Sequence, residues 1–193
     1  MAEALENLND EGLMERIKKN DHRAFSVLVE RRTDMFYAAA FRMVMNKSDA
    51  EDVVQEAFLK IWGKPNLWKS SKGAKFTTWF YRIVMNLSID KMRKLSKENK
   101  VELDDDVSSN VFSQEKKLLI DEEQQALQTA MKALPDKQLM ALNLCFYEEL
   151  SNKEAASIMK VGVKALESLL MRAKANLKNE LMQTNTIKQE GVV

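Results

Sequence analysis

Apolar side chains recur along most of this chain at the spacing of three and four residues that places them on one face of an α-helix. The segment DAEDVVQEAFLKIW shows the pattern clearly, with Val53, Val54, Ala57, Phe58 and Ile61 on one face. Glycine and proline, which interrupt helices, number only 5 and 2 in 193 residues. A β-rich fold would need more turn residues and more β-branched runs. The pattern therefore predicts an all-α protein.

Capping and turn residues divide the first half of the chain into helices. We expect Asp10 to cap a first helix, with a break near Asn20-Asp21. Ser48 or Asp49 is expected to cap the DAEDVVQEAFLKIW helix, which Gly63-Lys64-Pro65 ends. A short basic loop over residues 66–74 then leads to a further helix.

That further helix, KFTTWFYRIVMNLSIDKMRK, is expected to run from about Phe76 to Leu95 and is too hydrophobic for a helix with one apolar face. On a wheel of about 100° per residue it shows three faces. The core face contains Phe76, Trp79, Phe80, Ile83, Val84 and Leu87. A basic and amide flank contains Lys75, Arg82, Asn86 and Arg93. A second apolar stripe contains Tyr81, Met85, Ile89 and Met92. A helix that is apolar nearly all round is enclosed, so another helix of its own domain or a partner must cover this stripe.

A segment of weak periodicity separates two parts of the chain. It covers residues 97–114 and contains the acidic run Asp104-Asp105-Asp106. We expect a flexible acidic linker there, between one small helical domain over residues 1–96 and a second over residues 115–193.

The second domain contains the pattern of a helix-turn-helix. Ser151 and Glu154 form a Ser-x-x-Glu capping box that opens a short helix. Lys160-Val161-Gly162 follows, and a longer amphipathic helix begins near Val163. A short helix, a tight connection containing glycine and a longer helix are typical of DNA-binding modules.

Charge is unevenly distributed along the chain, although the formal net charge is only +1. Residues 69–100 hold nine basic and two acidic side chains, and residues 101–125 hold eight acidic and two basic ones. The lone Cys145 excludes an intramolecular disulfide and suits a reducing compartment. With no apolar stretch near the ~20 residues of a membrane span and no signal-peptide pattern at the N-terminus, we expect a cytoplasmic protein without membrane insertion.

Residues for catalysis or metal binding do not cluster in the sequence. There is no glycine-rich phosphate loop and no nucleophile motif, and the single histidine, His22, has only Cys145 as a possible soft co-ligand. The acidic run at 104–106 lacks the glycine and glutamate spacing of a calcium loop. We expect no enzyme and no cofactor or metal.

Two blocks carry a resemblance to a known family. DAEDVVQEAFLKIW followed by KFTTWFYRIVMNLSIDKMRK resembles conserved region two of bacterial sigma factors, specifically the extracytoplasmic-function (ECF) group. ALPDKQLMALNLCFYEELSNKEAASIMKVGVKALESLLMRAKANLKNEL resembles their region four. The resemblance covers about residues 21–181. It implies an alternative sigma factor that binds core RNA polymerase and directs promoter recognition, strand opening and transcription initiation, and that an anti-sigma factor holds inactive.

The resemblance also assigns roles to residues. Region two would dock on the β′ clamp coiled coil and open the −10 element, and region four would bind the β flap and the −35 element. The polymerase-binding candidates, which otherwise form a solvated face, are Asp49, Asp52, Gln55 and Glu56. The −10 candidates are Ser70, Ser71, Lys72, Lys75, Arg82, Asn86 and Arg93. The −35 candidates are Lys164, Glu167, Ser168, Met171, Arg172 and Lys174.

The recognition helix departs from the family pattern. Leu166-Glu167-Ser168-Leu169 stands where the family usually has basic residues. A glutamate repels phosphate, although it can accept a hydrogen bond from cytosine N4. The −35 assignment is therefore weaker than the −10 assignment.

Other interpretations remain open at this point. Trp68 is either a packing anchor for its loop or a platform on which a base stacks. The acidic linker either contacts basic polymerase surface or only solubilises the chain. The whole chain could instead be a sigma-like protein that sequesters an anti-sigma factor without binding DNA, or a conventional helix-turn-helix regulator.

Overall fold

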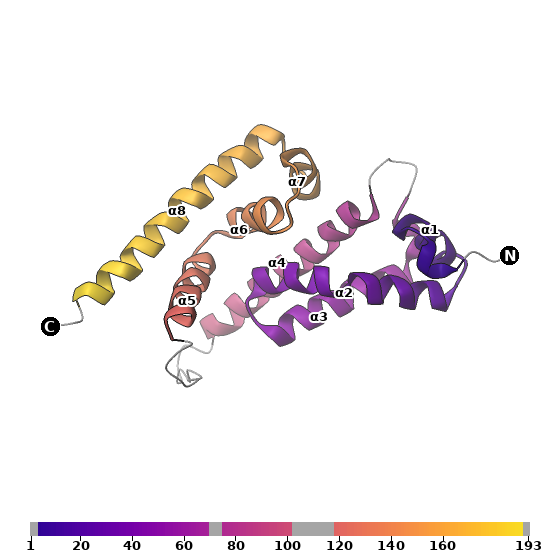
Figure 1. The fold of residues 1–193 in the computed structure, drawn as a ribbon, viewed down its shortest axis with the longest axis horizontal. Helices are drawn as coiled ribbons and strands as arrows, with labels where there is room; N and C mark the ends of the chain where they lie inside the picture. The colour runs from indigo at the N-terminus through magenta and orange to yellow at the C-terminus, as the bar shows by residue number, and fades with distance from the viewer. Residues whose placement is uncertain (1–3, 70–74, 102–117, 191–193) are drawn as a thin grey trace.

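The computed structural model describes residues 4–69, 75–101 and 118–190, and over these ranges the chain forms helices and connecting turns with no strand. The N-terminal domain contains α1 (Asp10–Ile17), α2 (His22–Val44), α3 (Lys47–Gly63) and α4 (Phe76–Val101), with short 3₁₀ turns η1 (Leu5–Asn7) and η2 (Pro65–Leu67). The C-terminal domain contains α5 (Leu118–Lys132), α6 (Asp136–Leu142), the π-helical turn η4 (Asn143–Tyr147), α7 (Asn152–Met159) and α8 (Val163–Glu190). The all-α prediction is confirmed (Figure 1).

Aromatic packing holds α2, α3 and α4 together. The ring of Phe80 lies 4.5 Å from that of Phe36, 4.9 Å from that of Phe58 and 5.4 Å from that of Phe76, measured between centroids. All four side chains are buried. Aromatic pairs at such distances stabilise a core by about 0.5–1.5 kcal/mol beyond their buried area. The predicted core face of α4 is thus the face that packs on α2 and α3.

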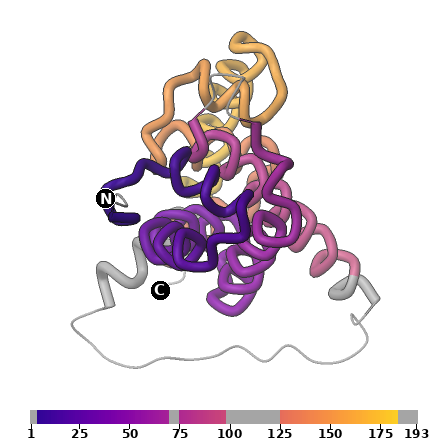
Figure 2. The backbone as a smooth tube through the Cα atoms, turned by 90° about the vertical axis from the view of Figure 1, so that its right-hand side faces the viewer, coloured from indigo at the N-terminus to yellow at the C-terminus, as the bar shows by residue number. Residues whose placement is uncertain are grey.

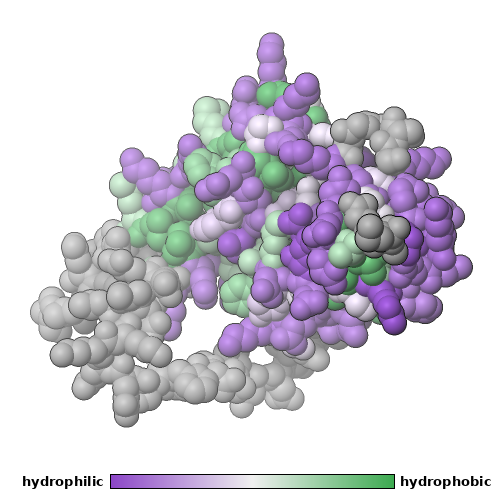
Figure 3. Space-filling view, turned by 45° about the vertical axis from the view of Figure 1, so that its right-hand side comes forward, coloured by the Kyte–Doolittle hydropathy of each residue, from purple (hydrophilic) through white to green (hydrophobic). Residues whose placement is uncertain are grey.

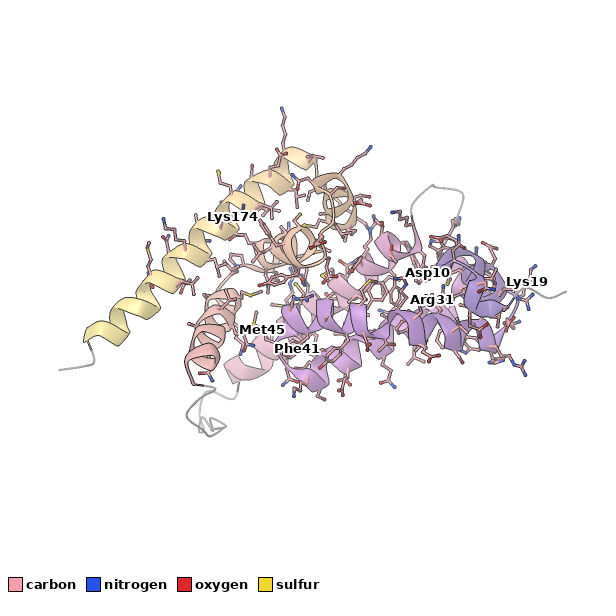
Figure 4. All side chains as sticks on the ribbon, viewed as in Figure 1. Asp10, Lys19, Arg31, Phe41, Met45 and Lys174 are labelled. Carbon is pink, nitrogen blue, oxygen red and sulfur yellow. The ribbon has the colours of Figure 1, made fainter. Side chains whose placement is uncertain are left out.

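Polar contacts hold α1 onto this core. The side chain of Asn9, and not that of Asp10, caps α1 by accepting a hydrogen bond from the backbone N–H of Gly12 at 2.8 Å. The predicted cap at Asp10 is wrong because its carboxylate instead accepts hydrogen bonds from Arg31 and Arg32 of α2, at 3.2 and 2.8 Å. Figure 4 shows Asp10 beside Arg31. A buried carboxylate needs such partners.

Two further boundaries differ from the sequence prediction. Asn46, two residues before Ser48, caps α3 through a hydrogen bond from the backbone N–H of Asp49, so neither Ser48 nor Asp49 is the cap. Helix α4 continues to Val101, beyond the expected end at Leu95. The predicted break before α2 is present, and Asp21 caps that helix. The acidic run at 104–106 lies outside the described residues.

The C-terminal domain has the predicted helix-turn-helix. The capping box is complete, because Ser151 accepts from the backbone N–H of Glu154 while the Glu154 carboxylate accepts from that of Ser151. Lys160 ends α7 with a left-handed φ of 55° and turns the chain toward α8. The apolar face of α8 then packs on α6 and α7 through buried residues such as Leu166 and Ala173.

The two domains pack against each other, and their buried apolar residues form one continuous cluster. Figure 2 shows the C-terminal helices above α2 and α4. The face shown in Figure 3 is mostly hydrophilic, with apolar patches between charged side chains. Within the described ranges we find no helix with the length and hydropathy needed to cross a membrane.

Candidate functional site

The basic and amide flank of α4 is present as predicted. Lys75, Asn86 and Arg93 are exposed, and Arg82 is half-buried. Because they follow one another at helical spacing, they lie along one side of α4. We refer to Lys75, Arg82, Asn86 and Arg93 as the α4 flank.

The loop before α4 is described only at its start. Ser70, Ser71 and Lys72 lie outside the described residues, so their predicted contacts stay predictions. Trp68 is only 2% exposed, and Lys18 places its ammonium 4.9 Å from the centroid of the indole. A ring that is buried in this way anchors the loop and offers no free face for a base.

Two side chains of the α4 flank contact the C-terminal domain. The Nη2 of Arg82 donates a hydrogen bond to the backbone carbonyl of Ser157 at 2.7 Å. The Nε of Arg93 donates to Asp136 at 3.0 Å. Sequence reasoning missed both contacts, because the partners stand 75 and 43 positions away and no periodicity links them.

The second apolar stripe of α4 is covered from two sides. The ring of Tyr81 lies 4.9 Å from that of Phe36 in α2, and its hydroxyl donates a hydrogen bond to Glu148 of the C-terminal domain. Met85 is fully buried, and Ile89 lines a cavity together with residues of α7. Both the helix's own domain and the other domain of the chain therefore cover the stripe.

Glu148 is the centre of a polar cluster at this interface, together with Arg42 and Tyr81. The Nη1 of Arg42 lies 2.6 Å from one carboxylate oxygen of Glu148, and the Tyr81 hydroxyl contacts the other. Burial, followed by the hydrogen bond to Glu148, raises the pKa of Tyr81 well above its ordinary value. The phenol therefore stays protonated and keeps donating to Glu148. We refer to Arg42, Tyr81 and Glu148 as the Glu148 cluster.

The predicted −35 residues lie on α8 and face away from the N-terminal domain. The exposed members are Lys164, Glu167, Met171, Arg172 and Lys174. Ser168 is half-buried, and its hydroxyl donates to the backbone carbonyl of Lys164 at 3.0 Å. Lys174, labelled in Figure 4, has its ammonium 4.6 Å from the ring of Phe146. The structure thus presents these side chains together on one open face of the recognition helix.

The predicted polymerase-binding residues lie on the outer face of α3, where Lys91 of α4 reaches two of them. Its ammonium lies 3.0 Å from Asp49 and 2.9 Å from Asp52. The hydrogen bond with Asp52, then that with Asp49, raises the pKa of Lys91. Glu56 pairs with Lys60 at 3.0 Å, and Gln55 is exposed. Sequence analysis missed Lys91 as a partner of this acidic face.

Beside Gln55, an apolar depression of about 380 Å³ lies between α2 and α3. Phe25, Tyr37 and Phe58 line it, and Leu59 at its edge is 58% exposed. Sequence analysis did not identify this depression. Leu59 does not belong to the core face of α3, and an apolar residue at such a position is the one feature of the sequence that could have indicated an apolar surface here.

Metal-binding chemistry finds no support in the part of the chain that the structure describes, because no three His, Cys, Asp or Glu side chains gather there in a group that could hold an ion. What the site offers is charge, amide groups and exposed apolar side chains on helix surfaces.

Comparison with known families matches both domains of the chain. A family model described as sigma-70 region 2 matches residues 28–98, and one described as sigma-70, region 4 matches residues 124–177. The α4 flank from Lys75 to Arg93 and the acidic face of α3 lie in the first range, and the candidate face of α8 lies in the second.

Curated relatives match over nearly the whole length. ECF RNA polymerase sigma factor SigW of Bacillus subtilis is 31% identical over 180 residues, covering 87% of this chain and 94% of the relative. ECF RNA polymerase sigma-E factor of Escherichia coli K12 is 29% identical over 186 residues, which cover 91% of this chain and 96% of the relative.

Two solved structures share the fold. CnrH, in complex with the cytosolic domain of CnrY, matches with a TM-score of 0.67 and 24% identity over 90% of this chain and 97% of that chain. RpoE of Bartonella quintana, in complex with the anti-sigma factor NepR, matches with a TM-score of 0.62 and 22% identity. The match covers 82% of this chain and 96% of that chain.

Proposed function

The chain belongs to the ECF RNA polymerase sigma factors, and from this premise we propose how its two domains direct transcription initiation. The protein binds core RNA polymerase, brings it to promoters and takes part in strand opening. The observation that carries this function is the presence of both sigma-70 regions in one chain that aligns with an ECF relative over 94% of that relative's length. The polymerase performs the catalysis, and the sigma factor acts with it in the cytoplasm.

The α4 flank recognises the −10 element. Its cations suit phosphate oxygens, which position a protein on DNA, and the exposed amide of Asn86 suits a base edge. Arg82 and Arg93 extend this surface along α4. Ser70, Ser71 and Lys72, which precede the flank in the sequence, supply hydroxyl and ammonium groups for the same element. The buried Trp68 supports this proposal by anchoring the start of the loop that carries these residues.

The exposed face of α8 recognises the −35 element. Lys164, Arg172 and Lys174 contact phosphates, and Met171 suits an apolar contact with a thymine methyl group. Glu167 accepts a hydrogen bond from cytosine N4 and repels nearby phosphate. The support for this assignment is that these side chains gather on one helix face that the N-terminal domain leaves open.

The acidic face of α3 binds the β′ clamp coiled coil of the polymerase, and the C-terminal domain binds the β flap. Asp49 and Asp52 already hold Lys91, which shows that this face accepts a basic side chain. Gln55 and Glu56 widen the face. A basic partner helix would compete with Lys91 for the same two carboxylates.

An anti-sigma factor is a further partner of the protein. The solved relatives CnrH and RpoE share this fold and are bound to the cytosolic domain of CnrY and to the anti-sigma factor NepR. We expect a helical protein to bind this chain in the same regulatory role.

Run-off transcription tests the function. The protein is added to core polymerase with fragments of genomic promoter DNA, and we expect transcripts from discrete start sites. Binding to core polymerase without any discrete start site would contradict the proposal.

The Arg82→Ala, Arg93→Ala double variant separates promoter recognition from sequestration of an anti-sigma factor. Loss of two DNA contacts should weaken promoter binding by the holoenzyme about tenfold or more. The control is the Lys19→Ala, Arg23→Ala double variant, which removes two exposed cations of the same domain away from α4. If promoter binding survives in the first variant, the chain acts by sequestration instead.

A further inference from the structure

Helix α1 and the residue that follows it contact the chain on both sides of residues 69–75, the stretch that leads into α4. Before this stretch, the ammonium of Lys18 lies 4.9 Å from the centroid of the Trp68 indole. After it, the Glu11 carboxylate accepts a hydrogen bond at 2.8 Å from the backbone N–H of Phe76, the first residue of α4. In Figure 1, α1 lies beside the first turn of α4. One short helix therefore holds the chain at two places that the sequence separates.

Both held positions are anchored in the core, whereas their neighbours are not. Trp68 is buried and Phe76 is fully buried, and their rings pack edge to face with centroids 6.3 Å apart. Such an aromatic pair adds to the stability that burial provides. Lys69 and Lys75, the next residues on the inner side of each anchor, are exposed. The anchors therefore fix the backbone from which two exposed cations project.

Helix α1 is itself firmly attached to the domain. Three apolar side chains of its inner face are buried: Leu13, Met14 and Ile17. The Asp10 carboxylate accepts hydrogen bonds from Arg31 and Arg32 of α2. Groups on an element that packing and hydrogen bonds lock in place hold their partners more precisely than groups on a loose segment. Glu11 and Lys18 therefore act from a fixed frame.

The contacts of Glu11 and Lys18 differ from the contacts that attach α1 to the core. Both side chains are half-buried, and neither belongs to the buried apolar face of the helix. Removing either side chain leaves that apolar face in place. What such a change loosens is the backbone at Phe76 or the indole of Trp68, next to the exposed lysines.

The matched family region leaves α1 without a role. The sigma-70 region 2 match begins at residue 28, after both α1 and Lys18. Lys75 of the α4 flank nevertheless directly precedes the residue that Glu11 caps. The contacts of α1 thus reach a surface that the proposed function uses, from a part of the chain that lies outside the matched region.

We propose that α1 is a positioning element for −10 recognition and that it acts through Glu11 and Lys18. These two residues hold Phe76 and Trp68, so that the cations beside them meet DNA in one fixed arrangement. The inference rests on the proposed function, in which Lys75 contacts the −10 element. A surface that is ordered before binding loses less conformational freedom when DNA arrives, which makes its contacts tighter and more selective. Neither positioning residue needs to touch the DNA.

Discrimination between promoters tests this role. Holoenzyme with each variant is titrated with a promoter mapped by run-off transcription, and with the same promoter after replacement of its −10 element. Glu11→Ala and Lys18→Met should each reduce the ratio of the two affinities, and the double variant should reduce it about tenfold, the effect of one lost base contact. Replacement of the −35 element instead should weaken binding by the same factor in every variant, because α1 does not contact α8.

Conservative variants and matched controls separate positioning from stability. Glu11→Gln keeps an oxygen that accepts from the same N–H, and Lys18→Arg keeps a cation over the indole, so both should retain most of the −10 discrimination. Glu15→Ala removes the pair that Lys18 makes on the surface of α1, and Asn46→Ala removes the cap of α3. Neither control removes a contact at either end of residues 69–75, so both should leave the ratio unchanged.

A spectroscopic measurement on the free protein checks the contacts without DNA. The chain has three tryptophans, so incorporation of 5-fluorotryptophan gives three fluorine signals in NMR, of which Trp68→Phe identifies one. Lys18→Met should shift this signal, and Glu11→Ala should broaden it, because the ring of Phe76 packs on the indole. Glu15→Ala should leave the signal as it is in the unmodified protein.

The possible outcomes judge the two proposals separately. Discrete transcription starts together with unchanged −10 discrimination in the Glu11→Ala, Lys18→Met double variant would overturn the positioning role and leave the sigma function standing. An equal loss of discrimination in Asn46→Ala would also overturn it, because lower stability would then account for the effect. A Trp68 signal that neither variant changes would show that the contacts do not order the chain. If no promoter gives a discrete start, the proposed function fails first and the positioning role fails with it.

Discussion

The backbone N–H of Phe76 donates a hydrogen bond to the Glu11 carboxylate at 2.8 Å, although 65 positions separate the two residues. Phe76 is the first residue of α4, where backbone N–H groups have no partner within the helix. Helix α1 therefore supplies the cap of the helix that carries the proposed −10 contacts. The positive end of the α4 dipole also favours a carboxylate at this place.

Glu11→Ala should lower the free energy of unfolding by about 1 kcal/mol, the usual cost of losing a helix cap. Urea unfolding followed by circular dichroism measures the change. Glu15→Ala, in the same helix, removes only an exposed pair with Lys18 and should cost less than about 0.5 kcal/mol. Equal losses in both variants would show that the Glu11 contact has no special role.

Lys91→Met should reduce stability in a way that depends on pH. Its contacts with Asp52 and Asp49 raise the pKa of Lys91 in the folded state. The stabilisation that charged Lys91 gives to the folded state is therefore complete below the pKa of lysine in the unfolded chain, about 10.4. It is lost as the pH rises through the higher pKa that Lys91 has in the folded protein. The difference in melting temperature between the unmodified protein and the Lys91→Met variant should be constant near neutral pH and should shrink above about pH 10. A difference that grows with pH would contradict this assignment.

Ser151→Ala should destabilise the C-terminal domain by about 1 kcal/mol, because it removes one half of the capping box at the start of α7. Exchange of the amide hydrogens of α7 with solvent should become faster. Lys153→Ala, an exposed neighbour in the same turn, should leave the exchange rates unchanged. Slow exchange in both variants would mean that the cap does not hold this helix.

Glu167→Gln should tighten binding to duplex DNA and make it less selective, because it removes a negative charge from the exposed face of α8. The measurement is fluorescence anisotropy with a −35 duplex from a promoter mapped by run-off transcription, and with a duplex whose cytosines are replaced. The affinities of the Glu167→Gln variant for the two duplexes should differ less than those of the unmodified protein. Unchanged affinity for either duplex would place Glu167 outside the DNA interface.

Helix content and helix faces were predictable because they depend on neighbours three and four positions apart. The core face of α4, with Phe80 at its centre, and the capping box of Ser151 and Glu154 follow from such local spacing. The cap of α1 was misassigned by one residue and that of α3 by at least two. Asn9 competes with the adjacent Asp10, and Asn46 competes with Ser48 and Asp49, because all these residue types cap helices about equally well. Only the folded structure shows which side chain reaches the free backbone N–H groups.

The candidate surfaces were predictable as sets of residues, but their partners were not. Nothing near Arg82 in the sequence indicates the carbonyl of Ser157, and nothing near Asp49 indicates Lys91. These pairs depend on how α4 lies against α7 and α3, which no local pattern encodes.

By itself the sequence determined an all-helical chain, a basic flank on α4 and a helix-turn-helix, since each of these follows from residue types at helical spacing. The two sigma-like regions, and the glutamate that is unusual in the recognition helix, came from the resemblance of two blocks to a known family. The tertiary structure alone decided what covers Tyr81 and where Glu148 lies. Those contacts join residues 67 positions apart, and their strength comes from burying a carboxylate between two donors. That burial exists only when both domains have folded and met.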